Sequence, residues 1–348
     1  MINLDLNPYS FDKKTKEKYF SSEVNKLTKY HYSKSKDYKK IIDSFGYNKK
    51  KDYELNDLPF VSTRIFKEVD LLSIKKSEIF KILRSSGTSG SVPSKIFLDK
   101  KNANEQRKIL NKIFSYSVCD QRLPILIIGK KPKFDKFSFD AKTAAILGFS
   151  IFGFDHHYFL DQKDQFNEAE FNNFFEKYQN KKFLIFGFTS DIYLKFLNNK
   201  QFNNKIDLSN GILLHGGGWK KLASLNISNK NFKKKILDKF NLKKVINYYG
   251  LIEQVGSIFF ECSKCNVFIC SDYSDLIIRD RNLNPIEKGI GFVQLMSLIP
   301  TSYPGHNILT EDLGEIVSVN GCDCGKKGKT FRIHGRILNS EIRGCSNV

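Results

Sequence analysis

A small, polar loop interrupts a chain that is otherwise rich in bulky residues. It reads SSGTSGSVPSKI at residues 85–96, between short strands expected at 79–83 and 95–98. Glycines allow a backbone to bend tightly and to point its N–H groups inward, and hydroxyls add further donors. The loop therefore predicts a cradle for phosphate groups, with a polar hairpin turn as the alternative. The residues of this cradle are Ser85, Ser86, Gly87, Thr88, Ser89 and Gly90, with Lys95 as a cation beside them.

The spacing of this loop does not fit two common nucleotide-binding motifs. A Walker A loop has a glycine directly before its lysine, and the dinucleotide fingerprint has the order G-x-G-x-x-G. Residues 85–95 match neither pattern. The loop by itself therefore leaves the class of phosphate ligand open.

Four more short motifs follow the loop along the chain. They are HGGGW at 215–219, YYGLIE at 248–253, LTEDLG at 309–314 and HGR at 334–336. Taken together with the loop, this series resembles the adenylate-forming superfamily, whose members condense a carboxylate with ATP to an acyl-adenylate. The resemblance implies an α/β fold of mixed sheets packed with helices, a β-rich subdomain, and a C-terminal lid domain that is largely absent.

The resemblance also implies a role for each motif. The loop would hold the β- and γ-phosphates of ATP, and Glu253 would be a ligand of Mg²⁺. Asp312 would bind the ribose hydroxyls, and Arg336 would lie at the hinge. The glycine-rich strand end would contact adenine. The further ATP-binding residues implied are Gly216, Gly217, Gly218, Tyr249 and Gly250.

Two of these acidic residues have simpler interpretations. The sequence also allows Glu253 to be a surface residue at the start of a helix and Asp312 to lie in an ordinary β-turn. The motif around Asp312 departs from the superfamily's Thr-Gly-Asp, because Glu311 replaces the glycine. The geometry of this segment is therefore left open.

The flanking segments narrow the resemblance. LPFVSTRIFKE at 58–68, AAILGF at 144–149, HGGGWKKL at 215–222 and the closing GRILNSEIRGCSNV look like the acyl-protein synthetase family of bacterial luminescence systems, also called long-chain-fatty-acid luciferin-component ligase. In that family a fatty acid is adenylated, moved to a cysteine near the C-terminus and passed to a reductase. The resemblance therefore implies ATP, Mg²⁺, a fatty acid, an acyl-reductase-type protein partner and a self-acylating cysteine, Cys345.

The surroundings of Cys345 suit this role. Arg343 favours the thiolate, which is the nucleophilic form, and Gly344 supplies mobility. An inert terminal cysteine is the alternative. The chain stops twelve residues after Arg336, whereas full-length superfamily members continue into a mobile lid with a catalytic lysine. We therefore expect either this short tail or a partner protein to complete the second half-reaction.

Other cysteines form two close pairs on turn-like segments. The pairs are Cys262 with Cys265 and Cys322 with Cys324. Four sulfurs in this arrangement predict structural Zn²⁺, with nearby free thiols as the alternative. Cys270 is a candidate substitute ligand, and Cys119 is expected in the core.

The first residues, MINLDLNPYSFDKK, contain no apolar signal segment. A cytoplasmic protein is therefore expected, in which cysteines are thiols or metal ligands rather than disulfides. The longest apolar runs, at 123–128 and 144–154, are too short to span a membrane.

The net charge of +20 raises the alternative of a nucleic-acid-binding protein. The basic residues at 12–51 are interleaved with acidic ones, and a second basic cluster lies at 230–244. Both clusters are typical of solvated helix faces, so specific nucleic-acid binding is not expected.

Two other enzyme classes compete with the acyl-protein synthetase. HGGG also forms the oxyanion hole of some esterases, but the required G-x-S-x-G is absent downstream. A phenylacetate-CoA-ligase-like enzyme, which would pass its acyl group to coenzyme A, is the main alternative. His156, His157 and His215 are candidates for an acyl pocket, with a structural role as the simpler interpretation.

The chain divides into three expected regions. Residues 1–57 form a lysine-rich helical region, 58–335 the adenylate-forming core with a β-rich part from about 275, and 336–348 a short tail. Within the core, apolar runs predict buried strands and amphipathic runs predict helices. The strands are expected at 123–129, 182–187, 212–214 and 245–249, and the helices at 104–115 and 191–198.

Overall fold

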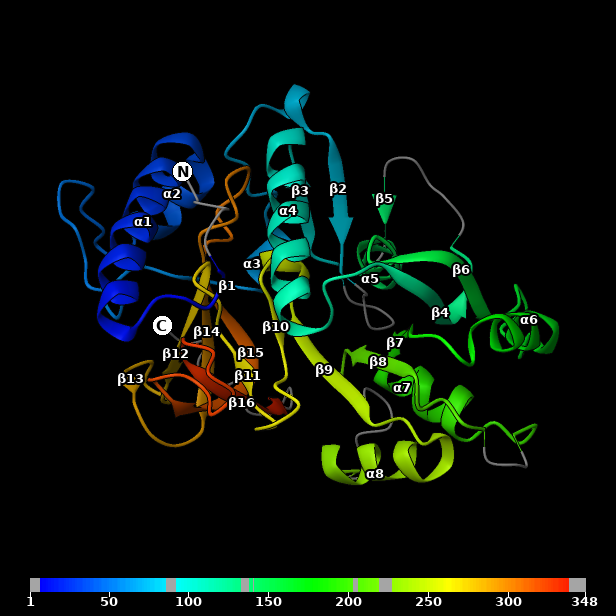
Figure 1. Cartoon of the computed structure of the whole chain (residues 1–348). Coiled ribbons are helices and arrows are strands. Elements are labelled where there is room, and N and C mark those ends of the chain that lie inside the picture. Colours follow the sequence, from blue (N-terminus) through cyan, green and yellow to red (C-terminus); the bar gives the residue numbers. More distant parts are fainter. Residues whose placement is uncertain are drawn as a thin grey trace.

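The strands of the protein are divided among three sheets in the computed structural model (Figure 1). The structure describes residues 7–85, 92–132, 138–139, 141–202, 206–218 and 227–337. Helices pack beside two of the sheets, and the predicted α/β class is confirmed.

The first sheet is parallel except at one edge, and its order is β10-β9-β8-β7-β4-β6. Its strands are β4 (Leu123–Lys130), β6 (Gly153–Leu160), β7 (Phe183–Phe188), β8 (Gly211–Gly216), β9 (Lys244–Gly250) and β10 (Ile258–Phe260). Four of them, β4, β7, β8 and β9, confirm the buried strands predicted from the apolar runs. Parallel strands read as continuous apolar runs because both faces of such a sheet are covered.

Helices cover the two faces of this sheet (Figure 1). They are α4 (Lys100–Ser117) and α5 (Ala141–Ser150) on one face, and α6 (Glu168–Tyr178), α8 (Asn229–Phe240) and the π-helix η2 (Ile192–Leu197) on the other. The predicted helix at 104–115 is confirmed within α4. The predicted helix at 191–198 is helical but changes type, because the short helix α7 (Thr189–Asp191) continues directly into η2.

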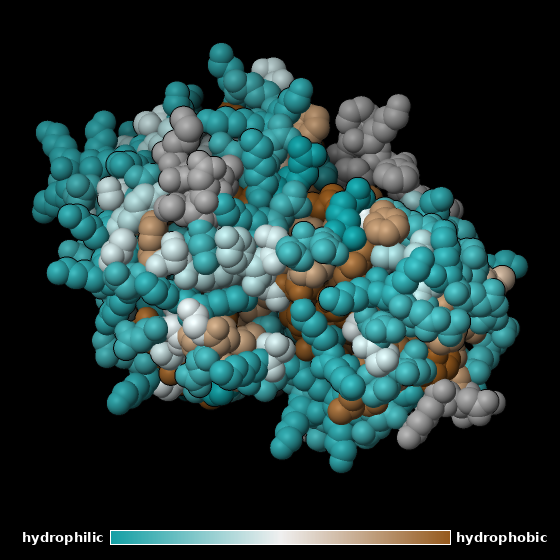
Figure 2. All heavy atoms as spheres, viewed as in Figure 1, coloured by the Kyte–Doolittle hydropathy of each residue, from teal (hydrophilic) through white to brown (hydrophobic). Residues whose placement is uncertain are grey.

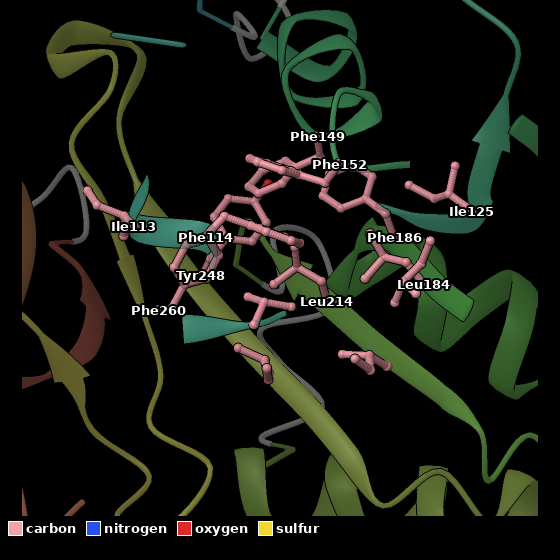
Figure 3. Packing of buried hydrophobic residues seen from close by; sticks show 14 of the residues in the cluster. Ile113, Phe114, Ile125, Phe149, Phe152, Leu184, Phe186, Leu214, Tyr248 and Phe260 are labelled. Atoms are coloured by element: carbon pink, nitrogen blue, oxygen red, sulfur yellow. The ribbon is translucent and has the colours of Figure 1, made fainter. Parts of the chain in front are cut away.

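Aromatic rings fill the space between the first sheet and the helices α4 and α5 (Figure 3). Phe149 packs against Phe186 at 4.6 Å between ring centroids and against Tyr248 at 4.7 Å. Phe114 and Phe152 stack at 3.6 Å. These rings are buried, so they hold the carboxyl-terminal half of β9, which contains Tyr248, in a fixed position.

The second sheet has the order β11-β16-β15-β14-β12-β13, and β1 pairs with β15. Its strands are β1 (Val61–Ser62), β11 (Phe268–Ile269), β12 (Ser274–Arg279), β13 (Pro285–Ile286), β14 (Gly291–Ser297), β15 (Asn307–Ser318) and β16 (Thr330–Arg336). Most strands of this sheet come from residues 268–336, and the predicted start of a β-rich part at about residue 275 stays a prediction.

The N-terminal helices pack beside this second sheet (Figure 1). They are α1 (Lys13–Lys34) and α2 (Lys36–Asp43), followed by the short helices α3 (Ile65–Glu68) and η1 (Lys76–Glu78). In α1, Phe20 and Val24 are buried against Ile277, Met296 and Leu298 of the sheet region. Both longer helices lie within residues 1–57, while the division of the chain at residue 57 stays a prediction.

The third sheet carries the two strands that flank the predicted phosphate loop. Its order is β3-β2-β5, with β2 (Lys81–Arg84), β3 (Lys95–Leu98) and β5 (Ser138–Phe139). The antiparallel pair β2–β3 confirms the two strands expected on either side of the loop. The loop residues Ser86, Gly87, Thr88, Ser89 and Gly90 lie outside the described residues.

The surface shown in Figure 2 is mostly hydrophilic, and hydrophobic residues are exposed near the middle of this face. No helix in the described part of the chain is both long and apolar enough to cross a lipid bilayer.

Two buried histidines lie between α1 and the second sheet. The rings of His31 and His306 stack at 4.7 Å between centroids. Nδ1 of His31 is 2.7 Å from Ser73 Oγ, and Nε2 of His306 is 2.9 Å from Thr28 Oγ1. Burial lowers the pKa of His31 to about 3 and holds the pKa of His306 well below its ordinary value. Both rings are therefore neutral at neutral pH.

We expect acidification to destabilise the protein through these two histidines. Their pKa values are lower in the folded chain than in the unfolded chain, so the unfolded state takes up protons first as the pH falls below about 6.5. The free energy of unfolding should fall by up to about 1.4 kcal/mol per pH unit for each histidine. Urea unfolding between pH 7.5 and 5.5 measures this slope. The variant H156Q, which changes an exposed histidine, should show the same slope with pH. A free energy of unfolding that does not change across this range would contradict the prediction.

Candidate functional site

Three residues predicted to bind ATP meet where the first and second sheets join. Tyr249, at the end of β9, donates its hydroxyl to Oδ2 of Asp312 on β15 at 2.7 Å. Arg336, at the end of β16, donates Nε–H to Oδ1 of the same carboxylate at 2.9 Å. Asp312 and Arg336 are also directly paired in the register of β15 and β16. Tyr249 thus links the two sheets at the site.

The Asp312 carboxylate is held in a fixed orientation by these two donors. Its side chain is only 7% exposed, whereas that of Arg336 is 66% exposed. Burial raises the pKa of Tyr249 well above its ordinary value, and the adjacent Asp312 raises it further, so the phenol remains a donor. Each carboxylate oxygen has a second lone pair that can accept a hydrogen bond. The arrangement therefore suits binding of a pair of hydroxyls.

A β-bulge positions Asp312. Along β15, Leu309 pairs with Gln294 and Leu313 with Phe292, so the register with β14 shifts in the segment that contains Asp312. The Thr310 hydroxyl donates to a carbonyl of β14 and accepts from the Asp312 N–H at 3.1 Å. The alternative of an ordinary β-turn is wrong, because the segment lies within a long strand. A bulge re-aims a side chain without a glycine, so Glu311 is tolerated in place of the superfamily's glycine.

Glu253 lies on the short helix η4 (Ile252–Gln254), directly after β9. It is only 8% exposed, so the alternative of a surface glutamate is wrong. Burial raises the pKa of its carboxyl, while the Ser94 hydroxyl and the positive charges of Arg336 and Lys67 oppose the shift. Glu253 therefore offers a carboxylate oxygen that can serve as a metal ligand. This carboxylate lies near Arg336 and hence near the Asp312 cluster.

Hydrogen bonds from neighbouring residues hold η4 in place. Gln254 donates Nε2–H to the Gly305 carbonyl at 2.9 Å. The Val255 N–H donates to the Tyr303 hydroxyl at 3.2 Å. A Cβ on Gly305 would lie 2.6 Å from the Glu253 carbonyl oxygen, so this close approach requires glycine. The backbone of Glu253 is thus packed directly against the loop that precedes β15.

The two ends of the phosphate loop meet beside Glu253. The Ser85 N–H donates to the Ser94 carbonyl at 3.0 Å, and the Ser94 N–H donates to Ser85 Oγ at 2.8 Å. The Ser94 hydroxyl is fully buried near the Glu253 carboxylate and has no hydrogen-bond partner of standard geometry among the described residues. Lys95 Nζ is 3.4 Å from Asp70 Oδ1 in a partly exposed ion pair.

The glycine-rich strand end lies next to the tyrosine motif. Gly216, at the end of β8, pairs with Tyr248 of β9 in the parallel register. A Cβ on Gly216 would lie 2.4 Å from the Tyr248 ring. Gly217 has a φ of +66°, in the left-handed region, and a Cβ on Gly218 would meet no atom of the described residues within 4 Å. Within the described part of the chain, the end of β8 is therefore closely packed at Gly216 and open at Gly218.

His215, which precedes these glycines, makes the contacts of a structural residue. It is buried, and Nδ1 lies 2.9 Å from the Thr189 hydroxyl. Its ring packs against Phe232 of α8 at 5.0 Å between centroids. Burial lowers its pKa to about 3, so the ring is neutral. A role for His215 in an acyl pocket stays a prediction.

The other two candidate histidines lie on β6, at the far edge of the first sheet from β9. His156 is exposed and its Nε2 lies 2.9 Å from the Ser150 carbonyl. His157 is buried between Glu170, at 3.0 Å, and Asp155, at 3.3 Å. Neither residue is in contact with the Asp312 cluster in the described residues.

The paired cysteines gather in one place. The sulfurs of Cys262, Cys265 and Cys322 lie within 4.8 Å of one another, and Cys324 is exposed on the same turn as Cys322. Cys270 is not one of the three gathered sulfurs and is fully buried in a different hydrophobic cluster, so its role as a substitute ligand stays a prediction. The predicted acyl acceptor, Cys345, lies outside the described residues.

Two residues near Glu253 were not singled out from the sequence. Ser94 belongs to the predicted loop, but its side chain type gave no sign that it would be buried. Lys67 precedes the loop by a long stretch of chain, and its positive charge acts on the Glu253 carboxyl. The only sequence signal for Lys67 was its position in the flanking segment LPFVSTRIFKE.

Comparisons with known proteins identify the family of this chain. A family model described as acyl-protein synthetase, LuxE, matches residues 1–348. The long-chain-fatty-acid–luciferin-component ligase of Vibrio harveyi is 24% identical over 327 residues, which cover 91% of this chain and 83% of the relative. The enzyme of the same name from Aliivibrio fischeri is 22% identical over 329 residues, covering 91% and 84%.

Solved structures show the same fold. A 2-hydroxyisobutyryl-CoA ligase in an open conformation, in complex with 2-HIB-AMP and CoA, aligns with a TM-score of 0.72 at 14% identity, over 99% of this chain and 79% of its own. The same enzyme in its thioesterification state aligns with a TM-score of 0.69 at 14% identity, over 97% and 74%. With a family model that spans all 348 residues, the chain belongs to the LuxE acyl-protein synthetase family and is a ligase with an adenylate-forming fold.

Proposed function

We propose that this protein uses ATP and Mg²⁺ to activate a fatty acid as an acyl-adenylate and then transfers the acyl group to its own Cys345. A reductase-type protein would collect the acyl group from the resulting thioester. Family membership supports the activation step, and the acceptor cysteine is proposed from the resemblance of the closing segment.

One observation carries the proposal. The charge of Arg336, in the Tyr249–Asp312–Arg336 cluster, acts on the Glu253 carboxyl, and Ser94 at one end of the serine- and glycine-rich loop lies beside that carboxyl. Motifs from distant parts of the chain therefore surround one region at the junction of the sheets. The ribose, triphosphate and metal functions of one nucleotide require such a convergence.

The first half-reaction joins two anions, so its main difficulty is charge repulsion. A carboxylate oxygen of the fatty acid attacks the α-phosphorus of ATP and forms a new O–P bond. The bond from this phosphorus to the bridging oxygen breaks, and pyrophosphate leaves with its electron pair. Lys95 and Arg336 would offset the negative charge that accumulates in the transition state, together with loop N–H groups.

Glu253 fits a magnesium ligand because it is a buried carboxylate beside a buried hydroxyl, that of Ser94. Magnesium prefers oxygen ligands and keeps several waters. When bound, Mg²⁺ would neutralise phosphate charge. Asp312 would orient the ribose through its free lone pairs, while Tyr249 and Arg336 keep its carboxylate in place.

The second half-reaction needs a nucleophile rather than further charge neutralisation. The Cys345 thiolate would attack the carbonyl carbon of the acyl-adenylate and form a C–S bond. The bond from this carbon to the phosphate oxygen breaks, and AMP leaves. The product is a thioester on the enzyme, which keeps the acyl group activated for a partner.

Pyrophosphate release tests the activation step directly. The purified full-length protein is incubated with ATP, Mg²⁺ and saturated fatty acids of increasing chain length, and pyrophosphate and intact mass are measured. We expect acid-dependent pyrophosphate release and a mass increase equal to one fatty acid minus one water. Formation of acyl-CoA in the presence of coenzyme A, without a mass increase, would instead support a coenzyme A ligase. No acid-dependent pyrophosphate release with any acid would overturn the proposal.

Replacement of Asp312 by asparagine should weaken ATP binding. The change removes a charged acceptor for the ribose hydroxyls, and hydrogen bonds to charged groups contribute about 1.5–3 kcal/mol. The KM for ATP in pyrophosphate release should therefore rise about 10-fold or more, with a smaller effect on kcat. The matched control is E315Q, on the same strand, where the carboxylate pairs with Arg332 instead. An unchanged KM for ATP in D312N would contradict the ribose assignment.

Two further expectations stay predictions. A cytoplasmic location is one, and the absence of specific nucleic-acid binding is the other. The family and the fold favour a ligase over a nucleic-acid-binding protein.

A further inference from the structure

A cluster of cysteine sulfurs lies outside the nucleotide site. Three sulfurs, from Cys262, Cys265 and Cys322, lie within 4.8 Å of one another, and no other group of three or more potential ligands is found in the described part of the chain. The cysteines come from two turns, one between β10 and β11 and the other between β15 and β16. The tertiary fold brings these three sulfurs together from turns that are far apart in sequence.

The two turns share a backbone shape. In each, the second cysteine is followed by a residue in the left-handed region, Asn266 with a φ of +54° and Gly325 with a φ of +90°. Each turn is closed by a backbone hydrogen bond to the carbonyl of its first cysteine, from Asn266 N–H at 2.8 Å and from Gly325 N–H at 2.9 Å. Each turn is therefore a tight loop that carries two cysteine sulfurs, and the two loops have similar shapes.

Backbone N–H groups in these turns point at the first sulfur of each pair. The N–H groups of Lys264 and Cys265 donate to the sulfur of Cys262, and the N–H of Cys324 donates to the sulfur of Cys322. A negatively charged sulfur accepts such hydrogen bonds more strongly than a neutral thiol does. Backbone donors at these positions suit sulfurs that carry negative charge when a metal is bound.

We propose that Cys262, Cys265, Cys322 and Cys324 together bind one structural Zn²⁺ ion. A tetrahedral Zn²⁺ has Zn–S distances of about 2.3 Å, which places its sulfurs about 3.8 Å apart. The three gathered sulfurs are already close to this spacing. Cys324 completes the set from the same turn as Cys322, and four thiolates are a ligand set that favours zinc.

Positive charges surround the cluster and balance the proposed site. Four thiolates with one Zn²⁺ carry a net charge of about −2. The charge of Lys326 acts on Cys322, Cys324 and Cys262. Lys264 donates Nζ–H to the Asp323 carbonyl at 3.1 Å, so it bridges the two turns. These two lysines offset the negative charge of the site.

The site would fasten several elements that meet here. Lys326 lies 4.9 Å from the centre of the Tyr9 ring and 3.3 Å from Ser117 Oγ at the end of α4. The Tyr9 hydroxyl is in turn 2.9 Å from Ser117 Oγ. The metal would therefore hold the loop that leads into β16 against the N-terminal segment and α4. Because β16 ends at Arg336, the zinc site would also limit the movement of the strand that carries this residue.

Metal analysis of the intact protein tests the proposal. The full-length chain is purified under reducing conditions without chelator. Its zinc and iron contents are then measured by elemental mass spectrometry. We expect about one zinc per chain. Removal of zinc with a chelator should lower Tm by about 5 °C or more. Addition of cobalt(II) to the metal-free protein should produce the absorption bands of tetrahedral thiolate coordination.

Two variants separate a metal site from a simple packing cluster. C324S changes an exposed residue, so it should fold, but it should bind zinc about 10-fold or more weakly. C119S changes a cysteine outside the cluster and should keep the full zinc content. Absence of zinc from the purified protein together with absence of cobalt bands would overturn the proposal. A protein that contains iron only, or a disulfide within this cluster under reducing conditions, would also overturn it.

Discussion

Replacement of Cys345 by alanine is expected to abolish the covalent acyl-enzyme while acyl-adenylate formation continues. The thiolate takes part only in the second half-reaction, so pyrophosphate release in the first turnover does not require it. The amount of acyl-enzyme should fall at least about 100-fold, because no other group is proposed to act as nucleophile. Intact mass after incubation with ATP, Mg²⁺ and fatty acid measures the adduct, and quenched-flow assays measure the first turnover.

The matched control for this variant is C119S. Cys119 is partly exposed, and its sulfur donates to the Gln121 carbonyl at 3.3 Å and is not part of any proposed site. C119S should therefore keep the full mass increase and its sensitivity to neutral hydroxylamine, which cleaves thioesters. If C345A still carries the acyl group, peptide mapping identifies the true acceptor and the assignment of Cys345 is wrong.

Replacement of Glu253 by glutamine should greatly reduce acyl-adenylate formation without lowering the stability of the protein. Loss of a group that stabilises charge in the transition state costs about 10²–10³-fold in kcat, and we expect a loss of this size in pyrophosphate release. The Mg²⁺ concentration needed for half-maximal rate should rise as well. These two parameters are measured by titration with Mg²⁺ at saturating ATP.

The effect of E253Q on stability is expected to be opposite in direction to its effect on activity. Burial raises the pKa of Glu253 in the folded protein, so this group stabilises the fold when protonated and the contribution is lost as the pH rises. The raised pKa means that burying the ionised carboxylate costs stability. The neutral amide in E253Q removes this cost, so Tm in the absence of nucleotide should be equal to or higher than that of the unchanged protein.

E261Q is the matched control for E253Q. Glu261 is also a buried glutamate, but its carboxylate is satisfied by Asn229 at 2.7 Å and by Lys233 at 2.9 Å. E261Q should lower Tm and leave the Mg²⁺ dependence unchanged. A variant E253Q with normal Mg²⁺ dependence, or with the same loss of stability as E261Q, would show that Glu253 has a structural role only.

The positions of most strands around the site could be predicted from the sequence. The run at 123–129 is continuously apolar and the run at 245–249 is interrupted only by Asn247, and a strand covered on both faces favours this pattern. Each run ends in glycine or polar residues. These endings also predicted that the glycine-rich segment lies at the end of β8 and the tyrosine at the end of β9. Local chemistry determines such features, since they depend on the neighbours of a residue along the chain.

The environment of the acidic residues could not be predicted in the same way. Asp312 was open to interpretation as a turn residue and Glu253 as a surface residue. Their burial depends on the packing of β15 against β14 and β16 and of η4 against the loop at Gly305. The sequence contains no local signal for a bulge that replaces a glycine turn, because the bulge exists only relative to a paired strand.

The sequence by itself determined the types and the order of the chemical groups in this protein: the hydroxyl-rich loop, the glycine-rich strand end, the carboxylates and the paired cysteines. The tertiary structure decided which of them meet. The Tyr249–Asp312 hydrogen bond joins two sheets, and the sulfurs of Cys262 and Cys322 approach across two distant turns. Contacts between residues far apart in the chain depend on how whole sheets and helices pack, and packing depends on all buried side chains together rather than on any single motif.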